Sequence, residues 1–246
     1  MRISEVASTL AEARVLPGLA REMKPRPLSA HDCFAARAEA TAAKYPEHTA
    51  VIFEGRELNW RELNAFANQY VGALRGSGLK RGETVSVMLE NRIEYVALLI
   101  ALNKLGARAA LINTNLTGGP LVHCMSITDS VMCIFGEERL DAIAEVRKDP
   151  ALAAVSHYLF VPDAGELDCP GWAANLAEEA ADEDRENPPE TAQMTLGDIA
   201  LYIFTSGTTG LPKAAVLSNR RYLMTAALSH KAGLRCDSRD CIYLCL

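Results

Sequence analysis

The sequence predicts an α/β fold in which mostly parallel sheets are flanked by helices. The chain has 246 residues, of which 49% are hydrophobic and 23% are charged, and this composition is typical of a globular protein. An apolar run at 84–89 is followed by a helical pattern at 91–105 and a second apolar run at 108–112. A strand, a helix and a strand in this order form a βαβ unit, which places the two strands parallel in one sheet.

Capping residues and turn residues define the other expected elements. Asn59, followed three residues later by Glu62, indicates a capping box that opens a helix ending near Gly76. Ser29 is the expected N-cap of an earlier helix that runs to about Lys44. Further helices are expected at 117–128, 137–148 and 220–231, and further strands at 49–53, 56–58, 131–135, 157–161, 199–204, 214–217 and 240–246.

The charge pattern divides the chain into four expected parts. Residues 178–190 contain seven acidic residues and the pair Pro188-Pro189, which is typical of a solvated linker. We therefore expect an N-terminal segment and linker at 1–28, a first α/β subdomain at 29–177, an acidic linker at 178–195, and the start of a second α/β subdomain at 196–246.

Composition also limits the kinds of binding partner and the cellular compartment that we expect. The formal net charge of −6 gives no bulk basic field that would attract nucleic acid. Seven cysteines, an odd number, argue against a disulfide framework and favour the reducing cytoplasm. No secretory signal and no apolar run of about 20 residues is visible. Residues 1–19 suit an amphipathic helix, which leaves two alternatives: docking on the domain, or peripheral association with the inner face of a membrane.

The stretch that carries chemistry runs from Tyr202 to Lys213. Glycines let a backbone turn tightly and present its N–H groups to an anion, while hydroxyls and an ammonium group donate to phosphate oxygens. An apolar run precedes the stretch and another follows it, so the loop is held between two strands. An ordinary surface turn would not explain these flanking strands. The candidate nucleotide-binding residues are Tyr202, Thr205, Ser206, Gly207, Thr208, Thr209, Gly210 and Lys213.

Other motifs for catalysis or binding are absent from the sequence. Leu211 and Pro212 separate Gly210 from Lys213, and no Ser or Thr follows the lysine, so the stretch is not a P-loop. No G-x-S-x-G elbow supports a serine hydrolase. The histidines show no zinc-protease spacing, and the C-x4-C-x3-C pattern near residue 246 is not a standard zinc site.

The stretch T-S-G-T-T-G-L-P-K, after its aromatic-containing strand, resembles the phosphate-binding loop of the AMP-forming adenylating enzymes. These are the acyl-CoA synthetases, luciferases and peptide-synthetase adenylation domains. Residues 111–116 and 121–124, and the pair Ala214-Ala215 after the lysine, resemble the very-long-chain acyl-CoA synthetase and fatty-acid transport protein branch. The resemblance covers residues 30–246 and implies the N-terminal part of the large domain of such an enzyme.

The resemblance implies a fatty acid substrate, ATP, Mg²⁺ and coenzyme A as co-substrate. It implies that Thr208 or Thr209 binds the magnesium ion. The family's catalytic lysine and its adenine and ribose contacts are expected beyond residue 246, so the missing C-terminal part of the synthetase is an expected partner. This 246-residue chain alone is therefore expected to be inactive. A non-catalytic nucleotide-binding module and an interaction module derived from this fold are the alternatives.

Overall fold

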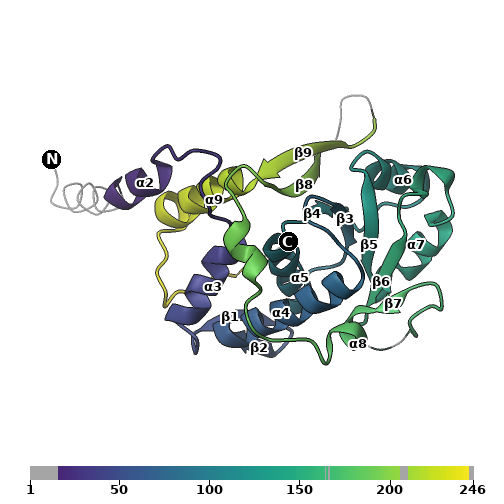
Figure 1. The fold of residues 1–246 in the computed structure, drawn as a ribbon, viewed down its shortest axis with the longest axis horizontal. Helices are drawn as coiled ribbons and strands as arrows, with labels where there is room; N and C mark the ends of the chain where they lie inside the picture. The colour runs from purple at the N-terminus through teal and green to yellow at the C-terminus, as the bar shows by residue number, and fades with distance from the viewer. Residues whose placement is uncertain (1–15, 164, 166, 206–209, 244–246) are drawn as a thin grey trace.

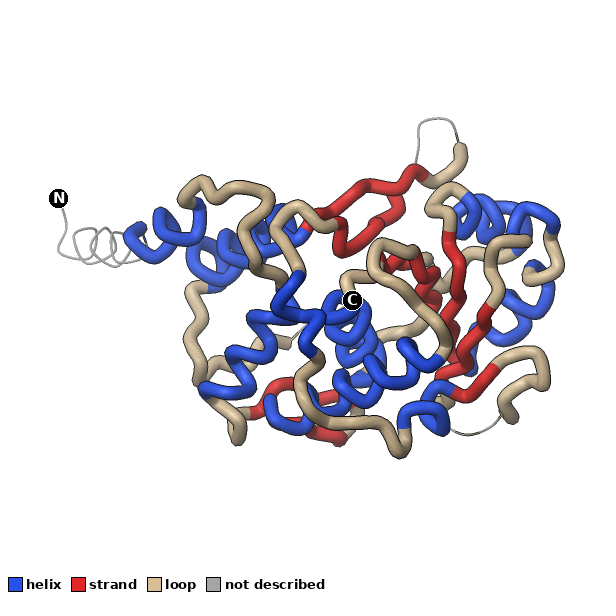
Figure 2. Tube along the Cα trace, in the orientation of Figure 1, coloured by secondary structure: helices blue, strands red, loops and turns tan. Residues whose placement is uncertain are grey.

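The protein has the predicted α/β fold, seen in a computed structural model that describes residues 16–163, 165, 167–205 and 210–243. One sheet has seven strands in the order β7-β6-β5-β3-β4-β8-β9 (Figure 1). All neighbouring strands in it are parallel except β8 and β9, which form an antiparallel pair. Figure 2 shows the strands of this sheet lying between helices.

The predicted strands up to residue 218 appear in the predicted order, and β7 and α8 are additions that the sequence analysis did not predict. The strands are β1 (Thr49–Phe53), β2 (Arg56–Asn59), β3 (Thr84–Met88), β4 (Arg108–Leu111), β5 (Ser130–Gly136), β6 (His157–Val161), β7 (Ala174–Asn175), β8 (Ile199–Thr205) and β9 (Lys213–Ser218). The α-helices are α2 (Leu16–Met23), α3 (Phe34–Lys44), α4 (Trp60–Gly76), α5 (Ile93–Leu105), α6 (Gly118–Ser126), α7 (Leu140–Val146), α8 (Leu176–Ala180) and α9 (Asn219–Ala227). Short helices are η1 (Glu137–Arg139), η2 (Pro150–Leu152), η3 (Pro189–Gln193) and the π-helix η4 (Leu228–Leu234).

Two apolar cores lie on opposite faces of the sheet. Successive side chains of a strand point to opposite faces, and β5 shows this directly. Met132 and Ile134 join the core under α3, α4 and α5, while Cys133 and Phe135 join the core under α6 and α7. Both faces of β5 are thus buried, which is why its sequence is an unbroken apolar run instead of an alternating one.

The strand order reverses direction beside β3, the central strand of the sheet. The chain passes from β3 to β4 on one side and then crosses back to β5 on the other side. In open α/β sheets the carboxyl ends of the strands at such a reversal form a crevice suited to ligands. The carboxyl end of β8 lies on the same edge, because β8 runs parallel to β4.

Helix caps confirm one sequence prediction and overturn another. The Asn59 side chain accepts from Glu62 N at 2.8 Å, and the Glu62 carboxylate accepts from Asn59 N at 2.9 Å, as the capping box requires. The N-cap predicted at Ser29 is wrong: α3 begins after Cys33, whose sulfur accepts from Ala36 N at 3.3 Å. Ser29 lies in a turn that the bond from Ala30 N to Pro27 O closes, and Ala30 O accepts from Leu196 N instead of a helical donor.

The C-terminal prediction also needs correction. The strand predicted at 240–246 is not seen at residues 240–243, which are exposed and have no regular structure; residues 244–246 lie outside the described range. Asp237 and Asp240 instead close a local turn, in which Asp237 N donates to Asp240 Oδ2 at 2.6 Å. Such side-chain-to-backbone bonds compete with strand pairing. The helix predicted at 220–231 is α9 continued by η4.

The acidic segment is exposed but tied to the fold. The carboxylate-bearing residues at 182–186 are exposed, as expected of a charged run. Asn68 Nδ2, however, donates to Arg185 O at 2.7 Å, and Asn187 contacts the buried end of Lys104. The strands on either side of the segment belong to one sheet, since β8 pairs with β4. The division into subdomains at 178–195 stays a prediction.

No helix among the residues described by the structure is both long and apolar enough to span a bilayer. The amphipathic helix predicted at 1–19 lies mostly outside the described residues. From residue 16 the chain forms α2, which packs beside α9 (Figure 1).

Candidate functional site

The two ends of the predicted phosphate loop are held face to face by a pair of strands. Thr205, the last residue of β8, is paired in register with Lys213, the first residue of β9. Directly opposed residues of an antiparallel pair point to the same face, with Cβ atoms about 5 Å apart. Both residues are exposed. The fold therefore sets a hydroxyl and an ammonium group side by side at the base of the loop.

Two further contacts support the described part of this loop. His123 on α6 donates from Nε2 to the carbonyl oxygen of Pro212, at 3.0 Å, next to Lys213. Gly210 has φ of +90°, a left-handed conformation that favours glycine. Phe204, one residue before the loop, packs against the core under α6 and α7. The backbone is thus held on both sides of the loop, by the packing of Phe204 before it and by the hydrogen bond to Pro212 after it.

Of the remaining candidate residues, the structure describes Tyr202 and leaves four residues of the loop undescribed. Ser206, Gly207, Thr208 and Thr209, and with them the predicted magnesium ligand, lie outside the described residues. Tyr202 is half-buried within β8, paired with Val216 of β9. It stands three residues before Thr205, so the two side chains leave opposite faces of the strand. The fold joins Thr205 to Lys213 but does not bring the Tyr202 side chain onto their face.

A charged cluster that the sequence analysis missed lies at the reversal of the strand order. Arg92, whose side chain is 4% exposed, forms an ion pair with Glu138, and its Nη1 lies 3.5 Å from Asp163 Oδ1. Arg139 forms an ion pair with Glu90. The three segments that carry these residues follow β3, β5 and β6, so the cluster joins three carboxyl ends of the sheet. A signal was present: E-N-R and E-E-R each follow a predicted strand.

Glu137 fixes the chain that follows β6. Its carboxylate accepts backbone N–H bonds from Asp163 at 2.7 Å and Gly165 at 3.3 Å through Oε2, and from Leu167 at 2.8 Å through Oε1. Glu137 is buried, so these bonds offset the desolvation of its charge. Glu137 therefore ties the segment that follows β6 to the carboxyl end of β5.

The described residues contain no group of three or more His, Cys, Asp or Glu side chains that would hold a metal ion. Six cysteines in the described part of the chain are free thiols. Burial raises the pKa of Cys124 to about 11, so this thiol beside His123 stays protonated at neutral pH. The described residues of the site, Thr205 and Lys213, offer donors for an anion.

Comparisons with known proteins show the family to which the chain belongs. The AMP-binding enzyme family matches residues 38–246, and the chain belongs to this family. It is 32% identical over 205 residues to the medium/long-chain fatty-acid–CoA ligase FadD6 of Mycobacterium tuberculosis, covering 83% of this chain and 32% of that protein. It is 33% identical over 217 residues to long-chain fatty acid transport protein 1 of Homo sapiens, a match that covers 85% of this chain and 32% of that protein. The chain thus spans about a third of the length of these curated relatives.

Among solved structures, the anthranilate CoA ligase AuaEII in complex with anthranoyl-AMP matches with a TM-score of 0.74 and 26% identity. The match covers 82% of this chain and 37% of that one. The resemblance inferred from residues 205–213 and its fatty-acid branch is confirmed, as is the fold of an adenylate-forming enzyme's N-terminal domain.

Proposed function

We propose that the chain supplies the triphosphate-binding part of an ATP-dependent ligase that joins long- or very-long-chain fatty acids to coenzyme A. The observation that carries the proposal is the register pair of Thr205 and Lys213 at the carboxyl end of a parallel sheet, in a member of the AMP-binding enzyme family. The fatty acid substrate is suggested by the printed names of the relatives, a fatty-acid–CoA ligase and a fatty acid transport protein.

The role of the loop follows from its charges. The fatty acid carboxylate attacks the α-phosphorus of ATP and pyrophosphate leaves. The thiol of coenzyme A then loses its proton and attacks the acyl carbon of the acyl-adenylate, which gives acyl-CoA and releases AMP. Lys213 and the Thr205 hydroxyl donate to the β- and γ-phosphates, where negative charge grows as pyrophosphate departs. No residue of this loop needs to act as a base, because a carboxylate is already ionised at neutral pH. Magnesium bound at Thr208 or Thr209 would neutralise further phosphate charge.

The supporting residues position these donors. The His123 hydrogen bond to Pro212 fixes the backbone next to Lys213, and the packing of Phe204 fixes the backbone next to Thr205. A donor held in place before the substrate arrives loses little entropy on binding. The partners in this proposal are the fatty acid, ATP, coenzyme A and the rest of the synthetase, with no nucleic acid. The proposal also locates the protein in the cytoplasm or at the inner face of a membrane.

Replacing Lys213 by alanine tests the loop. We expect the variant to bind pyrophosphate and ATP, in the presence of magnesium, about 10- to 100-fold more weakly, because a hydrogen bond to a charged group contributes about 1.5–3 kcal/mol. Calorimetric titration measures the affinity. Lys80→Ala is the matched control, since Lys80 is also exposed and lies outside the loop. Equal affinity in both variants would remove the phosphate assignment.

A protein that stops at residue 246 is expected to form no acyl-adenylate from ATP and a panel of medium to very long fatty acids. Residues 1–246 span about a third of the relatives' length, and the resemblance assigns adenine, ribose and lysine contacts to later segments. Pyrophosphate release is the measurement, with a full-length ligase as the positive control. Fatty-acid-dependent release above background would show that these residues are sufficient for the first half-reaction.

A further inference from the structure

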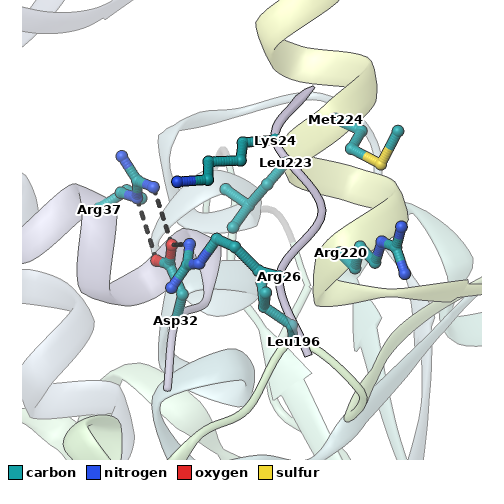
Figure 3. Close-up of a pocket in the computed structure, with 8 residues that line it drawn as sticks. All are labelled: Lys24, Arg26, Asp32, Arg37, Leu196, Arg220, Leu223 and Met224. Atoms are coloured by element: carbon teal, nitrogen blue, oxygen red, sulfur yellow. Dashed lines mark hydrogen bonds and ion pairs between the residues drawn. The ribbon is translucent and has the colours of Figure 1, made fainter. Parts of the chain in front are cut away.

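A second cationic site lies at the opposite end of β8 from the phosphate loop. Figure 3 shows the pocket, which is lined by Lys24, Arg26, Asp32, Arg37, Leu196, Arg220, Leu223 and Met224. Leu196 precedes β8 and Arg220 lies in the first turn of α9, which follows β9. The seven residues of β8 separate this pocket from Thr205 by about 20 Å. It is therefore distinct from the loop that carries the proposed function.

Two of the four cations are fixed by one carboxylate. Arg37 binds Asp32 through two bonds, Nε to Oδ1 at 3.0 Å and Nη2 to Oδ2 at 2.7 Å. Arg26 donates to the same carboxylate from the other side. Burial raises the pKa of Asp32, but the two guanidinium groups outweigh it and hold this pKa below its ordinary value. Asp32 is thus ionised and neutralises one of the two positive charges that it positions.

The other two cations, Lys24 and Arg220, differ from the first two. Among the residues that the structure describes, neither the Lys24 ammonium nor the Arg220 guanidinium forms a hydrogen bond or an ion pair. Figure 3 shows Lys24 extending across the pocket toward Arg37, with Arg220 on the α9 side. Four cations and one carboxylate leave three net positive charges around one small pocket. Like charges that converge in this way repel one another unless an anion joins them.

The remaining wall of the pocket is apolar. Leu196, Leu223 and Met224 line it beside the cations. Apolar side chains at this place offer no hydrogen bond to a ligand but can cover an apolar part of it. Residues from three separated segments thus form a site with a cationic end and an apolar wall.

We propose that this pocket binds a phosphate group that is attached to an apolar body. A phosphate carries up to two negative charges and offers several acceptor oxygens, so it can join Lys24 and Arg220 at once, with the fixed Arg26 and Arg37 adding to the field. A single carboxylate would leave more of the positive charge uncompensated. Two sources supply this chemistry: the headgroup of an anionic phospholipid, and a soluble phosphate ester. The pocket lies where α9 packs beside α2.

The test removes the two unpaired cations and leaves the Asp32 cluster intact. All proteins carry Lys213→Ala, so phosphate binding at the loop does not contribute to the signal. Lys24→Gln/Arg220→Gln is compared with Lys80→Gln/Lys148→Gln, which removes the same charge from exposed residues elsewhere. One arm measures co-flotation with vesicles of phosphatidylcholine, with and without phosphatidic acid. The other arm measures calorimetric binding of a soluble short-chain phosphatidic acid and of inorganic phosphate.

The expected result is binding in at least one arm that falls about tenfold or more in Lys24→Gln/Arg220→Gln and is unchanged in the control. Response of the vesicle arm alone identifies a membrane lipid as the source, and response of the soluble arm identifies a soluble ester. Equal losses in both double variants would mean a general effect of charge and would overturn the proposal. So would the absence of binding in both arms, whereas failure of the Lys213→Ala test on nucleotides would leave it standing.

Discussion

Replacing Lys104 by methionine is expected to lower the free energy of unfolding by about 3–5 kcal/mol, because it leaves buried acceptors without their cation. The Lys104 side chain has no exposed surface. Its Nζ lies 2.8 Å from Glu39 Oε1, 2.8 Å from Asn64 Oδ1, 2.6 Å from Asn68 Oδ1 and 3.1 Å from Asn187 Oδ1. Burial lowers the pKa of Lys104, while the bond to Glu39 acts in the opposite direction.

Urea denaturation measures this loss, and limited proteolysis measures its local consequence. Lys104 ties Asn187, in the acidic segment, to α4 and α5, so the variant should be cut at 182–187 sooner than the parent. Lys80→Met is the matched control, since Lys80 is exposed and its ammonium has no partner among the described residues. A loss below about 1 kcal/mol in Lys104→Met would show that the Asn and Glu oxygens find other donors.

Lys104 also illustrates what the sequence did not reveal. Within α5 it reads as one cation near the end of an apolar helix, and nothing local says that it is buried. Its partners lie on α3, on α4 and in the segment before η3, and Asn187 is 83 residues further along the chain. The same segment reads as a free linker because seven carboxylates dominate its composition, although the contact is made by an asparagine. Contacts of this kind depend on tertiary placement, which residue patterns do not encode.

Local signals, by contrast, were sufficient for the buried strands in the middle of the sheet. Buried parallel strands are continuous apolar runs, so β3, β5 and β6 were found where they are. The pairing of Thr205 with Lys213 follows from two strands joined by a short loop. Ser29 misled because Ser is a common N-cap, whereas the actual cap is the sulfur of Cys33, and Ala30 is held by Leu196. The position of β8 beside β4 required the whole topology.

The cluster at the carboxyl edge supplies the second large expected effect. Glu138→Ala should lower the free energy of unfolding by about 3 kcal/mol, because Arg92, 4% exposed, would keep only Asp163 as a charged partner. Arg92 Nη1 already has no hydrogen bond within the described structure, and loss of Glu138 would leave Nη2 of the same guanidinium without its acceptor as well. The variant also removes the acceptor of the Glu90 backbone N–H, at 2.8 Å.

Two further variants show whether Glu138→Ala destabilises the protein through the uncompensated charge of Arg92 or only through the loss of a contact. Glu47→Ala breaks the ion pair with Arg61, whose side chains are 65% and 63% exposed, and should lower the stability by less than about 1 kcal/mol. Arg92→Met/Glu138→Met removes both charges and should recover most of the stability that Glu138→Ala loses, since apolar replacement of a buried pair is often neutral. Urea denaturation of the four proteins gives these differences. If the double variant is as unstable as Glu138→Ala, the cluster stabilises the edge through its hydrogen bonds to the strand ends and not through compensation of the Arg92 charge.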